Sequence, residues 1–179
     1  RKIQSDRVAK DYLQSFQGIA ECIENANCIE DWYAIVDKLT DWLVKFDNLG
    51  DQGLGQLLEE QWREANQQFT RFIEVNYENW LRSKEKPLMS PDIISSYLQK
   101  NIQNDEKVVL IIMDCLRADH LKAMTNQLAQ IFHIDLDYYL SILPTATPYS
   151  RNAIFSGYFP NKLQTEYSDI WMKMWQDEN

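Results

Sequence analysis

What the sequence lacks excludes several classes of protein. Its three cysteines, Cys22, Cys28 and Cys115, are odd in number and have no CxxC spacing. This usage favours reduced thiols and a cytoplasmic setting, although Cys22 and Cys28 could in principle pair. The longest apolar run is far too short to span a membrane, and no basic-apolar-small signal segment opens the chain.

Positive charge is also scarce. The 179 residues carry a formal net charge of −9, which argues against a broad nucleic-acid-binding face because such faces are basic. Short nucleotides remain compatible with this charge if a bound metal supplies the positive charge. The length suits one or two small domains, and the start at Arg1 rather than Met suggests a fragment.

The first half of the chain has the pattern of a helical bundle. Apolar side chains recur at three- and four-residue steps from 1 to about 24, from about 31 to 46 and, after a turn at 48–53, to about 81. Three amphipathic helices with short connections predict an antiparallel three-helix bundle over 1–82. The aromatic residues of these stripes are expected in its core.

A buried strand ending on an acid is predicted in the second half. Residues 108–113 form an apolar run without alternation, typical of a strand buried on both faces of a parallel sheet, and the predicted strand spans 107–113. Asp114 follows at the carboxyl end, the edge where open α/β sheets bind ligands. A helix at 118–132 and a second strand at 138–143 complete a predicted right-handed βαβ unit.

Two threonines follow the second strand. Thr145 and Thr147 lie in the predicted turn before a helix that starts near Pro148 and ends at Gly157. Asp114 at one strand end and a threonine hydroxyl at the other could form a metal-activated nucleophile site. The alternative is purely structural: Asp114 caps the next helix, and Thr147 is the N-cap before Pro148.

The second half resembles a known enzyme superfamily. The stretch Pro144-Thr145-Ala146-Thr147, with 152–157 and Pro160 after it, resembles the nucleophile segment of the alkaline phosphatase superfamily. The apolar strand with Asp114 and Arg117 is similar to its first metal-binding strand. The nearer resemblance is to the PglZ domain, and nearer still to PorX-type response regulators linked to type IX secretion, through residues 139–155. The spaced tryptophans and 72–74 resemble the region that links receiver and PglZ domains there.

The resemblance implies a fold class and roles for individual residues. It implies an all-α bundle at 1–82 and the N-terminal portion of an alkaline phosphatase-like α/β domain at 83–179. Thr147 would be the nucleophile, with Thr145 as its rival, and would form a phospho-threonine. Asp114 and Thr147 would contact zinc, two ions in the complete domain. Arg151 and Asn152 would bind the phosphoryl oxygens, although Asn152 could equally be a helix-surface amide.

The implied activity is that of a zinc-dependent phosphodiesterase or phosphatase in two-component signalling. Its partners would be a phosphodiester or nucleotide substrate, an upstream receiver domain, cognate signalling proteins and a second copy in a homodimer. The superfamily's further Asp and His ligands do not occur in this chain, so residues 1–179 alone are expected to bind metal poorly and to be inactive. His120 and His133 are expected to be exposed or capping. The alternative function is a non-catalytic signalling scaffold that keeps the phosphatase fold.

Overall fold

The computed structural model describes residues 2–47 and 52–176. The chain divides into two compact units, and each is described by itself. The first comprises 1–85 together with 116–136, and the second comprises 86–115 together with 137–179. The segment 116–136, which the sequence places with the second domain, therefore lies with the bundle.

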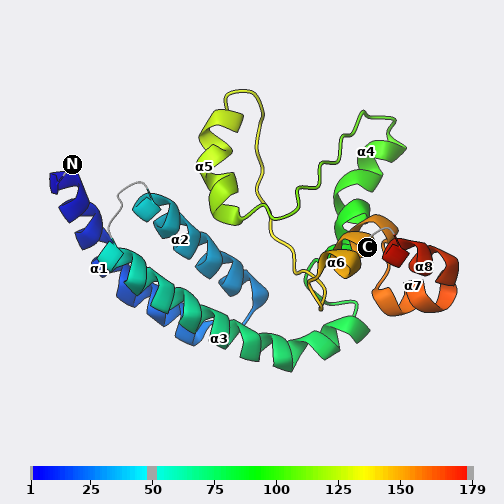
Figure 1. Cartoon of the computed structure of the whole chain (residues 1–179), viewed down its shortest axis with the longest axis horizontal. Helices are drawn as coiled ribbons and strands as arrows, with labels where there is room; N and C mark the ends of the chain where they lie inside the picture. Colours follow the sequence, from blue (N-terminus) through cyan, green and yellow to red (C-terminus); the bar gives the residue numbers. More distant parts are fainter. Residues whose placement is uncertain (1, 48–51, 177–179) are drawn as a thin grey trace. The chain divides into compact units, whose positions relative to one another are not determined.

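The first unit contains the predicted three-helix bundle. Helices α1 (Lys2–Asn25), α2 (Ile29–Asp47) and α3 (Gln52–Arg82) each pack against the other two (Figure 1). The core is formed by the predicted apolar stripes, since the following side chains are buried: Tyr12, Ile19, Ile23, Trp32, Ile35, Leu39, Trp42, Phe46, Leu58 and Ala65. Most of the predicted turn at 48–53 lies outside the described residues, and α3 has already begun at Gln52.

Aromatic rings fill much of this core. The ring of Tyr12 makes edge contacts with Trp42 and Phe46, at centroid distances of 5.1 and 4.9 Å. The Tyr12 hydroxyl donates to Oε1 of Gln61 at 3.2 Å, and both side chains are buried. Gln61 in turn donates from Nε2 to the backbone oxygen of Phe16 at 3.0 Å. This buried polar chain links α1 to α3 inside a largely apolar core.

A fourth helix packs on the bundle. Helix α5 (Ala118–Leu128) contacts α2, and both belong to the first unit (Figure 1). Within α5, Leu121, Met124 and Leu128 are half-buried, as their predicted common face requires. Ile131, predicted to lie on the same side, is beyond the end of the helix and is 76% exposed.

The second unit is made of short helices. A 3₁₀ turn η1 (Ser90–Asp92), a π-helical turn η2 (Ile94–Leu98) and α4 (Gln99–Gln103) follow one another. Helix α6 (Thr147–Ser156) packs on η1 and α8 (Ser168–Gln176), and α7 (Pro160–Glu166) packs on α8. The core of this unit is small, and its buried apolar side chains are Met89, Leu140, Ile142, Ala153, Ile154 and Leu163.

The α/β prediction was wrong for the strands at 107–113 and 138–143. The part of the chain that the structure describes is mostly helical and forms no strand, and only a parallel bridge joins Met89 to Leu140. Val109 and Ile111 are 83% and 75% exposed, the opposite of the burial predicted for them. A central parallel strand needs a neighbour on each edge and a covering layer on each face, and a two-stranded sheet alone is at best marginally stable.

Two smaller predictions can be compared with the structure. Cys22 and Cys28 are half-buried and form no disulfide, and Cys115 is exposed with a free thiol. His120 and His133 are exposed, as expected, with 59% and 91% of their side chains accessible.

Among the described residues, no helix combines the length and apolar character that a membrane crossing requires.

Candidate functional site

Helix α6 places Thr147 at its first turn. Its N-cap is Ala146, whose backbone is extended and whose oxygen accepts from the N–H groups of Tyr149 and Ser150, both at 3.0 Å. Thr147 is therefore the first helical residue, with Pro148 directly after it. The helix ends as predicted at Gly157, whose positive φ of 70° suits glycine.

The structural alternative for Thr147 and Asp114 is not what the structure shows. Ala146 occupies the N-cap of α6 without a side-chain bond, so Thr147 is not the capping residue. The N-cap of α5 is Arg117, so Asp114 does not cap that helix either. Thr145 and Thr147 are both exposed. Their hydroxyls are thus accessible at the N-terminal end of α6.

Hydrogen bonds among three serines fix this end of α6. The Ser150 hydroxyl lies 2.8 Å from that of Ser141 and 3.1 Å from that of Ser90. Ser90 is fully buried, and its hydroxyl accepts from the N–H of Ile142 at 3.2 Å. The helix is therefore tied to the segment before it and to η1. Sequence reasoning did not find these contacts among Ser90, Ser141 and Ser150, because a partner distant in sequence leaves no local signal.

The structure brings two of the predicted site residues together. Nη1 of Arg151, on α6, lies 3.5 Å from Oδ2 of Asp114, which sits in the turn after the apolar run. Their side chains are 35% and 58% exposed. Arg117, which could have paired with Asp114, instead forms a two-pronged bond with Asp119 at 2.9 and 2.8 Å. The carboxylate of Asp114 and the guanidinium of Arg151 therefore share one accessible surface near the start of α6.

Asn152 has a structural bond. Its Nδ2 donates to the backbone oxygen of Pro148 at 2.6 Å, one turn earlier in α6, and its side chain is half-buried. This bond matches the helix-surface interpretation of Asn152. The amide has a second N–H and an oxygen, so the bond does not consume all of its hydrogen-bonding capacity.

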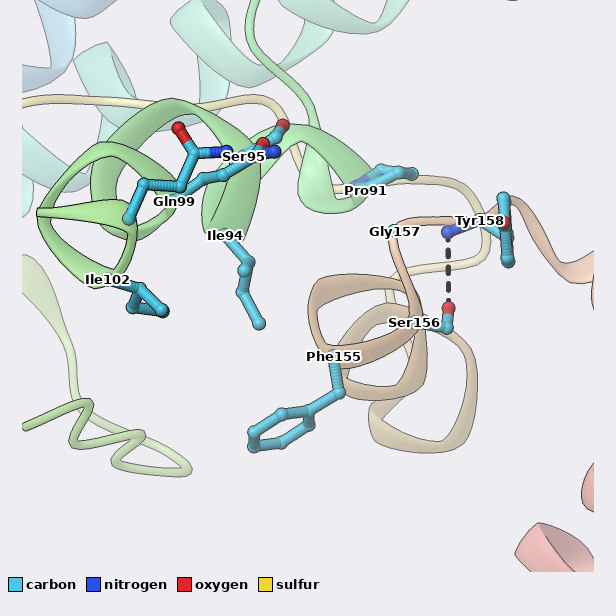
Figure 2. Close-up of a pocket in the computed structure, with 10 residues that line it drawn as sticks. Pro91, Ile94, Ser95, Gln99, Ile102, Phe155, Ser156, Gly157 and Tyr158 are labelled. Atoms are coloured by element: carbon cyan, nitrogen blue, oxygen red, sulfur yellow. Dashed lines mark hydrogen bonds between the residues drawn. The ribbon is translucent and has the colours of Figure 1, made fainter. Parts of the chain in front are cut away.

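A groove lies at the other end of α6. It has a volume of about 370 Å³ and is lined by η2, α4 and the segment from Phe155 to Tyr158 (Figure 2). Figure 2 shows the side chains of Ile94, Ile102 and Phe155 around this space, with the Ser156 hydroxyl accepting from the N–H of Tyr158. Phe155 comes two helical turns after Thr147, which is about 12 Å along a helix. The groove is therefore not the predicted phosphoryl site.

The residues present do not by themselves make a metal centre. Across the described ranges 2–47 and 52–176, no three His, Cys, Asp or Glu side chains come together as a metal site requires. The partner of Asp114 is a guanidinium, which a cation would have to displace. Since a protein zinc site takes three or four such ligands, Asp114 and Thr147 alone do not fit one.

Comparisons with known families divide the chain close to the domain boundary that the sequence pattern predicts. Residues 2–81 match a family model described as the PorX response regulator linker domain. Residues 94–177 match a model described as the BREX system PglZ alkaline phosphatase-like domain. No curated protein matches the chain. The two matched segments together account for most of the sequence.

Proposed function

We propose, since the chain carries both a PorX-type linker domain and a PglZ alkaline phosphatase-like domain, that it is part of a response regulator with phosphodiesterase or phosphatase activity. In this proposal the nucleophile is Thr147, and Arg151 binds the phosphoryl group. Coupling to type IX secretion and a cytoplasmic location belong to the same proposal. The linker domain would join the PglZ domain to an upstream receiver.

The observation that carries this proposal is the pairing of Arg151 with Asp114. The two residues are far apart in the sequence, yet their side chains meet at 3.5 Å beside the helix that begins with Thr147. An acid, a forked cation donor and an exposed hydroxyl are the groups that phosphoryl transfer to a protein nucleophile uses. Because Thr147 does not cap the helix, its hydroxyl is available for such chemistry.

The proposed reaction has two steps. Oγ1 of Thr147 attacks phosphorus and the bond from phosphorus to the departing oxygen breaks, while the threonine proton passes through solvent to that oxygen and frees the alcohol. The phosphoryl group then stays on Thr147 together with the second alcohol of the diester. Water attacks the same phosphorus, the bond to Oγ1 breaks, and a proton from the water restores the threonine hydroxyl and leaves a phosphate monoester. In both steps the guanidinium of Arg151 would hold two phosphoryl oxygens, because its donors match them in geometry. A diester substrate, including a nucleotide, is the substrate class proposed.

The proposal also includes zinc, two ions in the complete domain. Asp114 and Thr147 would be the contributions of this chain, and the remaining ligands would come from residues outside 1–179. Zinc would supply charge neutralisation and activation of the hydroxyl. A homodimer and cognate signalling proteins are the further partners proposed.

A second candidate is a signalling scaffold that keeps the phosphatase family's sequence without its catalysis. The specific observation that favours it is that the guanidinium of Arg151 already pairs with Asp114, the proposed metal ligand. A permanent ion pair of this kind would keep Asp114 from binding a cation.

Two matched variants of the full-length parent separate these candidates. Hydrolysis of a chromogenic phosphodiester is measured for the wild type, Thr147→Ala and Thr145→Ala. The enzyme proposal requires that Thr147→Ala abolishes turnover while Thr145→Ala, two residues away in the same exposed segment, retains it. Turnover that survives in Thr147→Ala, or is lacking in the zinc-loaded wild type, would reject the proposal.

A further inference from the structure

The contact between α2 and α5 joins the two matched families. Helix α2 lies within the residues that match the PorX linker domain, and α5 lies within those that match the PglZ domain. The two helices nevertheless belong to one compact unit and pack together (Figure 1). Part of the PglZ-matched sequence is therefore held on the surface of the linker bundle.

A lysine of α5 bridges two carboxylates of α2 at this contact. Nζ of Lys122, on α5, lies 2.7 Å from Oδ1 of Asp37 and 2.6 Å from Oδ1 of Asp41, both on α2. It also donates to the backbone oxygen of Asp37 at 2.9 Å. Asp37 and Asp41 are one helical turn apart, so they flank the ammonium group from the same face. All three of these acceptors come from α2.

The burial and the charge of Lys122 make its contact with α2 specific. The Lys122 side chain is only 16% exposed, whereas the two carboxylates are 45% and 51% exposed. Burial alone would lower the pKa of Lys122, but the bonds to Asp37 and Asp41 outweigh it and raise the pKa. The ammonium group therefore remains charged while largely removed from water. Undocking α5 would expose Lys122 and break three charge-assisted bonds at once.

We propose that α2 is the docking surface on which the linker domain holds α5 of the PglZ-matched sequence, with the Lys122 bridge to Asp37 and Asp41 as its specific element. The docking of α5 then affects the candidate site through the covalent chain, because only residues 115–117 separate Asp114 from α5. A signal that shifts the bundle would then act on the segment that carries Asp114. This inference does not depend on Thr147 being catalytic.

Hydrogen exchange of backbone amides tests the inference, in this chain and in the full-length parent. In Lys122→Met, which keeps most of the apolar stem, we expect exchange across 118–128 to become about tenfold faster. Exchange across 29–47 should stay the same, because α1 and α3 also hold α2. The control is Lys10→Met, which removes an exposed lysine of α1 in the same unit. It should change neither segment.

A charge reversal then tests specificity. Lys122→Glu should speed exchange in α5 further, and adding Asp37→Lys with Asp41→Lys should slow it again. The inference is overturned if Lys122→Met leaves 118–128 as in the control, or if α2 loses protection to the same extent as α5. It is also overturned if the amides of α5 in the wild-type parent exchange at the rate of an unprotected peptide.

Discussion

Replacing Tyr12 by phenylalanine should change how the stability of the bundle depends on pH. The Tyr12 hydroxyl is buried and donates to Oε1 of Gln61 at 3.2 Å. Phenylalanine preserves the edge contacts with Trp42 and Phe46 but leaves that oxygen without its donor. A buried acceptor left unsatisfied costs about 1–2 kcal/mol, so at pH 8 the variant should be less stable than the wild type by this amount.

At alkaline pH the variant should become the more stable of the two proteins. Burial raises the pKa of Tyr12 from 10.0 to about 12 in the folded chain. The folded state therefore keeps a proton that the unfolded state loses, and stability falls as the pH rises from about 10 to about 12. The loss is about 1 kcal/mol at pH 11 and approaches about 3 kcal/mol above pH 12. The variant has no phenolic proton to lose at this position, so the two stability curves should cross near pH 11.

Urea denaturation followed by tryptophan fluorescence measures both curves at intervals between pH 8 and 12. All other titrating groups are common to the two proteins, so their effects cancel in the difference. A double variant with Gln61→Met should recover part of the loss at pH 8, because both members of the buried pair are then removed. A difference between wild type and Tyr12→Phe that stays constant from pH 8 to 12 would refute the reasoning.

Three further predictions concern the core and the candidate site. Leu39→Ala, at a fully buried position of α2, should lower the free energy of unfolding by about 2–5 kcal/mol in urea denaturation, and a change below about 1 kcal/mol would be inconsistent with its burial. Arg151→Gln should alter stability by no more than about 1 kcal/mol, since the pair with Asp114 is partly exposed, yet it should reduce diester turnover of the parent about 100-fold. Unchanged turnover would remove Arg151 from the site. Residues 1–179 alone should bind zinc no more tightly than their Asp114→Asn variant in titration calorimetry, and tight binding that depends on Asp114 would show a site that the described side chains do not form.

The bundle could be predicted from the sequence because its signal is local. The stripe of Trp32, Ile35, Leu39, Trp42 and Phe46 fixes both the helix and its buried face, and all five are buried in α2. The strands could not be predicted from a local signal in this way. The apolar run at 108–113 is a genuine pattern, but a parallel strand is stabilised by neighbours on both edges, and the described residues provide none for it.

The candidate site was predictable only in part. Resemblance selected Asp114, Thr147, Arg151 and Asn152, and the structure pairs the first with the third. The bond from Asn152 to the Pro148 oxygen, and the serine bonds that fix α6, depend on geometry that spacing does not reveal. The docking of α5 on α2 had no signal either, because the acidic pair on α2 has the pattern of an ordinary solvated face until Lys122 is placed beside it.

The most direct test of the proposed function is to trap the covalent intermediate. The full-length parent is mixed with a phosphodiester, quenched in acid during turnover and digested, and mass spectrometry locates the residue that carries the phosphoryl group with its remaining ester. The account predicts an adduct on Thr147 that is lost in Thr147→Ala and persists in Thr145→Ala. An adduct on Thr145, or steady turnover with no adduct on either threonine, would contradict it.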